Sequence, residues 1–280
     1  MFVHLFNTSL KICLVGFESF LWIYRNKVSI VKAGAVAPLI ALLQSGNGNL
    51  RESAVATIST LSASDANKAV IGASDSVRLL VYILSDHAGT GSVQSKVDAV
   101  MALYNLSTLR QNLVSIITAG AVAPLTCLLK DCKKSSKLAT KIMGLLESCM
   151  EFEEGRCSLI QQNGGLLAVV EILEEGTVQG REYAVGALLT MCLTDRLKYR
   201  VSILEEGAIP GLLELRVQGT QQAQQKAQEL LSLLRDSPPP GKPVMMPCAM
   251  LKSVVSDIAS HVDDTGAAKK MLTEIFQLNV

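Results

Sequence analysis

One seven-residue string occurs twice in this chain, and a chain that repeats itself folds as an array of similar units. Ala-Gly-Ala-Val-Ala-Pro-Leu stands at residues 33–39 and again, letter for letter, at residues 119–125. Degenerate copies stand at 73–79, 163–169 and 206–212. The copies recur roughly every 43 residues, a period typical of helical solenoids. The sequence therefore predicts an all-α, right-handed α-α superhelix of about five repeats.

Each repeat is expected to contain three helices, and the pattern is clearest in the first copy. Two short helical stretches, 26–34 and 35–44, precede a longer one at 49–62. The third helices carry the strongest 3.6-residue periodicity of apolar residues. Small side chains beside that apolar stripe would let neighbouring third helices approach closely; they are Ala54, Ala99, Ala139, Ala184 and Ala227.

Glycine and proline mark the joint between the first and second helices of most repeats. A left-handed residue ends a helix at least cost when it is glycine, and four glycines follow apolar segments: Gly34, Gly120, Gly164 and Gly207. Prolines follow three or four residues later, at Pro38, Pro124 and Pro210. Proline is tolerated in the first turn of a helix, so each is expected to begin the second helix.

The composition excludes several classes of function. Hydrophobic residues make up 49% of the chain but aromatic residues only 4%, which suits closely stacked helices. The net charge of +1 leaves no concentrated basic face for nucleic acid. Seven cysteines form no Cys-x-x-Cys pair, so we expect neither a disulfide framework nor a zinc site, and interpret them as small buried residues in a reducing compartment.

No combination of residues points to catalysis or to a bound cofactor. The three histidines, His4, His87 and His261, have no neighbour that would complete a catalytic pair. Gly46-Asn47-Gly48 and Gly89-Thr90-Gly91 lack the Lys-Ser/Thr ending of a phosphate-binding loop, so they are interpreted as turns. We therefore expect no enzyme activity, no metal site and no cofactor.

Composition divides the chain into four predicted segments. Residues 1–25 are hydrophobic and match no repeat, residues 26–236 form the array, residues 237–247 are a proline-rich linker, and residues 248–280 are an amphipathic helical tail. In the tail, an apolar stripe runs over 251–262. It is expected either to cap the last repeat or to act as a separate interaction helix.

Three interpretations of residues 1–25 stay open. The segment could be a signal peptide or membrane anchor, but Glu18 interrupts the apolar run and leaves less than the roughly 18 residues that a span requires. It could instead be a helix that covers the first repeat. A third possibility is that the start is atypical or truncated, so that an earlier repeat is missing.

The repeated residues resemble a known family. Ala-Gly-Ala-Val-Ala-Pro-Leu-Thr-Cys-Leu-Leu at 119–129, with Ala-Leu-Tyr-Asn-Leu-Ser at 102–107, is similar to the armadillo (ARM) repeat, and the likeness spans about 26–235. Within that family the chain resembles the ARM region of plant U-box ubiquitin ligases and of relatives without a U-box. In the family the U-box precedes the repeats and recruits the ubiquitin-conjugating enzyme. About 25 residues precede the first repeat here, so the resemblance implies a partner-binding part without ligase activity of its own.

The resemblance also implies where a partner would bind. In armadillo proteins of nuclear import, third helices carry a Trp and, four residues on, an Asn that holds an extended basic peptide in the concave groove. The paired positions in this chain are Ala56 and Thr60, Met101 and Asn105, Lys141 and Leu145, Gly186 and Thr190, and Glu229 and Leu233. One Asn in five and no Trp argue against basic-peptide import. Asn105 could alternatively bond neighbouring backbone within the array.

These observations favour a scaffold or adaptor that binds a protein partner along its concave face, linked to ubiquitination or signalling in the cytosol or nucleus. The expected partner is a protein rather than a nucleic acid or a membrane, and the tail could dock on the array. Two alternatives remain. The chain could be the substrate-binding fragment of a U-box ligase, or an ARM protein tethered to a membrane through residues 2–24.

Overall fold

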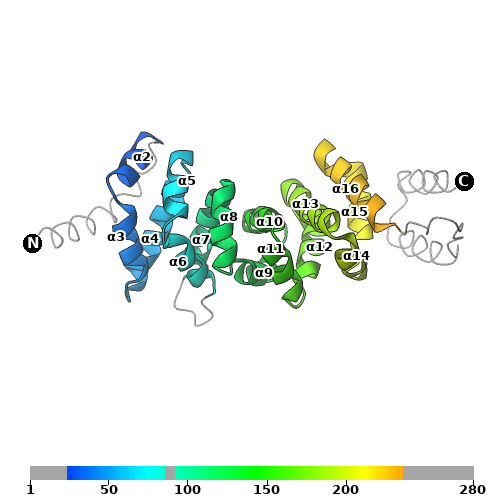
Figure 1. Cartoon of the computed structure of the whole chain (residues 1–280), viewed down its shortest axis with the longest axis horizontal. Coiled ribbons are helices and arrows are strands. Elements are labelled where there is room, and N and C mark those ends of the chain that lie inside the picture. The colour runs from blue at the N-terminus through cyan, green and yellow to red at the C-terminus, as the bar shows by residue number, and fades with distance from the viewer. Residues whose placement is uncertain (1–23, 86–91, 236–280) are drawn as a thin grey trace, which may run out of the picture. The chain divides into compact units, whose positions relative to one another are not determined.

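The described part of the chain is an all-α array, as the repeat period predicts. The computed structural model describes residues 24–85 and 92–235, and Figure 1 shows their helices following one another along the array. The chain divides into two units, residues 1–235 and 236–280, and every described residue belongs to the first. The predictions for the amino-terminal segment, the linker and the tail lie outside the described residues, and the predicted domain boundaries stay predictions.

Five repeats of three helices account for all the helices of the described residues. The first helices are α2 (Tyr24–Lys32), α5 (Asp65–Gly72), α8 (Arg110–Thr118), α11 (Glu153–Gln161) and α14 (Arg196–Glu205). The second helices are α3 (Val36–Leu43), α6 (Ser76–Leu84), α9 (Val122–Asp131), α12 (Gly165–Glu175) and α15 (Ile209–Gln218). The third helices are α4 (Gly48–Ser62), α7 (Val93–Ser107), α10 (Lys137–Cys149), α13 (Val178–Thr194) and α16 (Gln221–Leu234).

Every third helix begins at a residue whose side chain caps it. Each capping oxygen accepts a hydrogen bond from a backbone N–H of the first turn, which has no partner within the helix. The five capping residues are Asn47, Ser92, Ser136, Thr177 and Thr220. This common start fixes where the third helix begins in each repeat, and therefore which residues reach its exposed face.

The predicted glycine joints are confirmed in four of the five repeats. Gly34, Gly120, Gly164 and Gly207 all have positive φ, between 67° and 85°. The second repeat has no glycine at this point and no left-handed residue. There, the hydroxyls of Ser74 and Ser76 both donate to the carbonyl of Ile71, at 2.6 and 3.0 Å, so side chains satisfy the end of the first helix instead.

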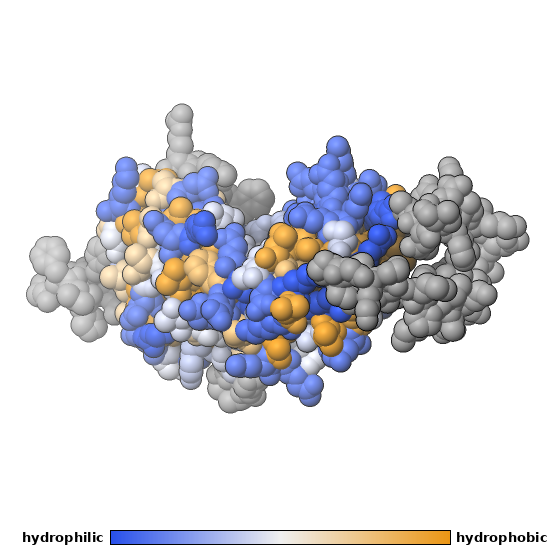
Figure 2. Space-filling view, turned by 45° about the vertical axis from the view of Figure 1, so that its right-hand side comes forward, coloured by the Kyte–Doolittle hydropathy of each residue, from blue (hydrophilic) through white to orange (hydrophobic). Residues whose placement is uncertain are grey.

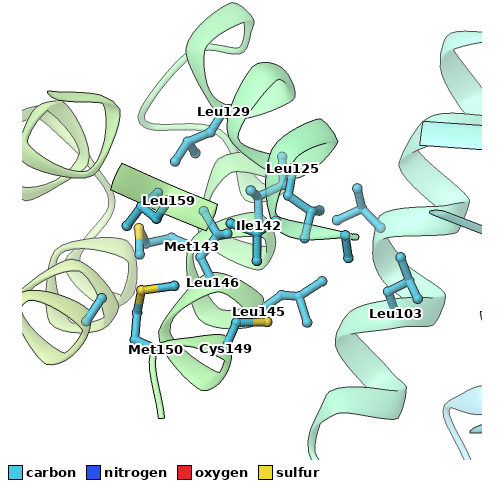
Figure 3. Packing of buried hydrophobic residues seen from close by; sticks show 14 of the residues in the cluster. Leu103, Leu125, Leu129, Ile142, Met143, Leu145, Leu146, Cys149, Met150 and Leu159 are labelled. Atoms are coloured by element: carbon cyan, nitrogen blue, oxygen red, sulfur yellow. The ribbon is translucent and has the colours of Figure 1, made fainter. Parts of the chain in front are cut away.

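The core is one continuous cluster that runs through the described repeats. The five alanines predicted to sit between third helices are all fully buried, which confirms the close approach of these helices. Figure 3 shows the centre of the cluster, where side chains of α9 and α10 meet those of the flanking helices: Leu103, Leu125, Leu129, Ile142, Met143, Leu145, Leu146, Cys149, Met150 and Leu159. Full burial of a side chain the size of leucine stabilises the fold by roughly 1.5–3 kcal/mol.

Buried asparagines on the first helices tie the second and third repeats to the repeats before them. Asn67 Nδ2 donates to the carbonyls of Leu61 and Lys27, at 3.0 and 3.1 Å. Asn112 repeats the arrangement one unit later, bonding Leu106 and Lys68, both at 3.0 Å. Because one carbonyl lies at the end of a third helix and the other on the preceding first helix, each amide fixes two neighbouring elements together.

No single helix among the described residues is both long enough and apolar enough to cross a membrane.

Candidate partner-binding face

The third helices pack side by side in sequence order, and their exposed sides form one face, which we call the inner face. The first residue of each predicted pair lies along its middle: Ala56, Met101, Lys141, Gly186 and Glu229. Exposure differs along this row. Glu229 is exposed, the side chains of the first three are half-buried, and Gly186 is buried. Their predicted role in binding a partner stays a prediction.

The second residue of each pair turns inward, towards the preceding third helix or its own backbone. Asn105 Nδ2 donates to the carbonyl of Ser59 and to the hydroxyl of Ser62 on α4, at 3.3 and 3.2 Å. This is the alternative role, a bond within the array, that the sequence left open for Asn105. Leu145 is fully buried, so its side chain does not reach the surface.

The remaining members of the second row are also committed to the array. Thr60 and Thr190 each donate their hydroxyl to a carbonyl one turn earlier in their own helix, at 3.0 and 2.9 Å. Leu233 is half-buried against the core. The structure therefore places the ten predicted residues in two rows, and the side chains of the second row bond or pack within the array.

Two tyrosines join third helices that are not neighbours. The hydroxyl oxygens of Tyr104 on α7 and Tyr183 on α13 lie 3.1 Å apart, and Gln179 Nε2 donates to Tyr183 Oη at 2.7 Å. The pair passes over α10 at Gly144, where a Cβ atom would lie 2.9 Å from both rings. Glycine inside a helix costs about 1 kcal/mol relative to alanine. The two rings need the space above α10, which explains why residue 144 is a glycine.

An ion pair makes a second crossing one repeat later. Glu147 Oε1 on α10 and Lys226 Nζ on α16 lie 3.2 Å apart. They pass over α13 at Gly186, where an added Cβ would collide with the carboxylate of Glu147. Burial raises the pKa of Glu147, and the charge and hydrogen bond of Lys226 oppose that rise.

The two crossings show on which side the array is hollowed. Packed helix axes lie about 8–10 Å apart, so alternate helices in a flat stack would be roughly 20 Å apart. Side chains that meet above the helix between them bring alternate helices closer on that side. The inner face is therefore the concave side of this part of the array.

Lys141 lies on α10, one turn before the tyrosine crossing at Gly144. Its ammonium nitrogen is 4.0 Å from the centre of the Tyr104 ring, a distance suited to a cation–π contact. The concave face thus presents a sequence of different surfaces. Half-buried Ala56 and Met101 come first, then a cation on an aromatic platform, then a neutralised ion pair, and finally the exposed carboxylate of Glu229.

Sequence reasoning missed the four residues that make the crossings. Tyr104, Tyr183, Glu147 and Lys226 do not occupy the family's paired positions, and each bridge joins residues 79 positions apart. One signal was available. Gly144 interrupts an otherwise regular apolar helix, and a glycine there usually has a packing reason.

Metal-ligand clusters and reactive thiols were the other kinds of site to look for in the described ranges. No group of three or more His, Cys, Asp or Glu residues in 24–85 and 92–235 could hold a metal ion. The cysteines described there are all free, and burial raises the pKa of Cys149 to about 12 and that of Cys192 to about 11. High pKa values keep both thiols protonated and unreactive at neutral pH.

On the face shown in Figure 2, apolar residues lie in separate patches among hydrophilic ones.

Three-helix repeats, glycine joints and a concave row of third helices define an armadillo repeat protein, and solved structures agree. A designed armadillo repeat protein is 24% identical and has a TM-score of 0.63, covering 75% of this chain and 87% of its own. Another, solved in complex with the peptide (KR)4, is 22% identical with a TM-score of 0.63, covering 81% and 94%. At such identities the likeness shows the fold alone.

The family follows from the sequence match. Residues 21–255 match the family described as the plant U-box protein ARM repeat region, and the chain belongs to it. U-box domain-containing protein 45 of Arabidopsis thaliana is 30% identical over 76% of this chain, and U-box domain-containing protein 17 of the same plant is 31% identical over 74%. The chain covers only 27% and 33% of these two relatives.

Proposed function

We propose that this chain is a protein-binding scaffold that takes a segment of a partner along the concave face of its ARM array. The observation that carries the proposal is the inner face itself. Five consecutive third helices, each begun by a capping residue, present their side chains on one continuous surface. A rigid row of shallow contacts, each weak alone, can sum to a specific affinity.

Ubiquitination is the proposed pathway, because the relatives that this chain resembles are named for a U-box. The matched region is the ARM region of that family, so the proposed contribution is partner recognition, without ligase activity in the residues of the array. Since the chain covers a third or less of the relatives above, a second proposal is that it supplies the substrate-binding part of a U-box ligase. The proposed place of action is the cytosol or the nucleus.

Site-specific photo-crosslinking tests whether the inner face meets a partner. A photoreactive amino acid replaces Met101 on the inner face in one variant and Val114, an exposed residue of a first helix, in another. We expect discrete crosslinked proteins from plant extract with the first variant and none of the same proteins with the second. Crosslinks of the same proteins at both positions, or at Val114 alone, would remove the inner face as the binding surface.

A further inference from the structure

Lys141 is a cation that the array holds in place without pairing it to an acid. Its ammonium rests 4.0 Å above the Tyr104 ring, and no carboxylate of the described residues forms an ion pair with it. Lys226, the other lysine in the centre of the inner face, is paired with Glu147. Only one of these two lysines is therefore neutralised within the array.

The tyrosine pair carries one hydroxyl proton more than its hydrogen bonds use. Two hydroxyls have two protons, and the bond between Tyr104 and Tyr183 uses one, whichever residue donates. Gln179 adds a donor to Tyr183 Oη rather than an acceptor. One O–H therefore has no protein acceptor among the described residues and can donate to a bound group.

The spare hydroxyl and the ammonium belong to one small region of the surface. Lys141 Nζ lies over the Tyr104 ring, and both candidate hydroxyls are at the outer end of that ring, 3.1 Å from each other. A carboxylate has two oxygens, each able to accept from a donor at about 2.8 Å. The region supplies donors of both kinds, one charged and one neutral.

We propose that Lys141 and the Tyr104–Tyr183 pair form a receptor for an acidic side chain, Asp or Glu, carried by a partner segment that lies along the inner face. The inference rests on the proposed function, because it names the chemistry of the partner for the same surface. Side chains that are already fixed lose little freedom on binding, and the crossing over Gly144 fixes both rings.

The acids nearby do not oppose an incoming carboxylate strongly. Glu147 lies close enough to Tyr183 to act on it electrostatically, and it is engaged by Lys226 at 3.2 Å. Glu182 accepts a hydrogen bond from the Thr220 hydroxyl at 2.6 Å. Lys141 forms no ion pair with a carboxylate of the described residues, and it therefore gives the centre of the inner face its preference for an anion.

Binding of defined peptides to the full 280-residue chain tests the receptor. Three fluorescent twelve-residue Gly-Ser peptides carry three central Glu, Lys or Gln residues, and fluorescence polarisation at low salt gives their affinities. We expect the Glu peptide to bind most tightly. Loss of one charge-assisted hydrogen bond at a half-buried position should weaken it about tenfold in Lys141→Gln.

Matched variants separate the site from general electrostatics. Lys137→Gln removes the same charge from the exposed first residue of α10 and should change the affinity less than about twofold. Tyr104→Phe with Tyr183→Phe should weaken the Glu peptide about threefold, because both rings stay and only the hydroxyls go. Lys141→Glu should reverse the preference in favour of the Lys peptide. Melting temperatures of all variants check that the array is intact.

Three results would overturn the receptor: equal losses in Lys141→Gln and Lys137→Gln, a Gln or Lys peptide that binds the unaltered chain as tightly as the Glu peptide, or no saturable binding of the Glu peptide. None of these would remove the proposed function, because crosslinking at Met101 tests the inner face without assuming any peptide chemistry. Conversely, if that crosslinking failed, the effect of Lys141→Gln on binding of the Glu peptide could still be measured.

Discussion

The two halves of the inner face are held together differently. In the amino-terminal half, contact is between neighbours, since Asn105 on α7 bonds Ser59 and Ser62 on α4. In the carboxy-terminal half, contacts also join alternate helices, since the tyrosine pair and the Glu147–Lys226 pair each pass over a helix at a glycine. The buried alanines are the same in both halves. The repeats therefore share a core and differ on the face that a partner would touch.

The largest expected effect is on stability, at the second residue of the predicted pairs, which is a different residue type in each half. Leu145→Ala should lower the free energy of unfolding by about 3 kcal/mol, because it leaves a cavity in a fully buried site. Asn105→Ala should cost about 1–2 kcal/mol through the lost hydrogen bonds to α4. Thr190→Ala should cost less than about 0.5 kcal/mol. Urea unfolding followed by circular dichroism gives the order, and equal costs would erase the difference between the halves.

The next effect distinguishes the two crossings from each other. Gly144→Ala places a methyl group 2.9 Å from two rings that cannot move independently, so the clash should outweigh the helix propensity gained and lower the melting temperature by a few degrees. Gly186→Ala meets the flexible ends of two side chains, Glu147 and Lys226, and should leave the melting temperature unchanged or higher. A stabilised Gly144→Ala would show that the tyrosines do not need the glycine.

A double-mutant cycle measures the ion pair itself. Glu147→Gln, Lys226→Met and the double variant should give a coupling energy of about 0.5–1 kcal/mol, which is the range for partly exposed pairs. Arg78 and Asp75, an exposed pair whose atoms are 3.4 Å apart within α6 and its cap, serve as the control and should couple less. If the two pairs had equal coupling energies, the Glu147–Lys226 pair would be no stronger than an ordinary surface ion pair.

The smallest effect is a dependence of stability on pH. Burial raises the pKa of Glu147 above the usual 4.5, so in this pH region the folded protein binds more protons than the unfolded chain. The contribution of Glu147 to stability is therefore lower above its folded pKa and recovers as the pH falls towards 4.5. The difference in unfolding free energy between the native chain and Glu147→Gln, measured from pH 7 to pH 5, should shift in favour of the native chain.

Much of the fold followed from local rules that each repeat obeys separately. Positive φ at Gly34 and Gly120 is a property of one turn, and the burial of Ala99 or Ala184 is a property of one helix stripe, so periodicity was sufficient to predict both. The capping residues, such as Ser136 and Thr177, obey an equally local rule and could have been predicted from the same pattern.

The inner face was predictable only in part, because its arrangement depends on residues far apart. The positions on the third helices followed from the family pattern, but the sequence does not say that Asn105 turns towards α4. The bridges depend on curvature as well, since Tyr104 meets Tyr183 only if α7 and α13 approach above Gly144. No single repeat contains that information.

The four glycine joints have a chemical consequence of their own. Around each, the space that a Cβ atom would occupy is open, with no atom within 4 Å, so only the sign of φ requires glycine there. A residue of mirror-image chirality favours positive φ, and its methyl group would meet nothing. D-alanine at Gly120, introduced by semisynthesis, should therefore fit without strain and stabilise the array by about 0.4–1 kcal/mol through the lower entropy of the unfolded chain. L-alanine at the same place should destabilise it.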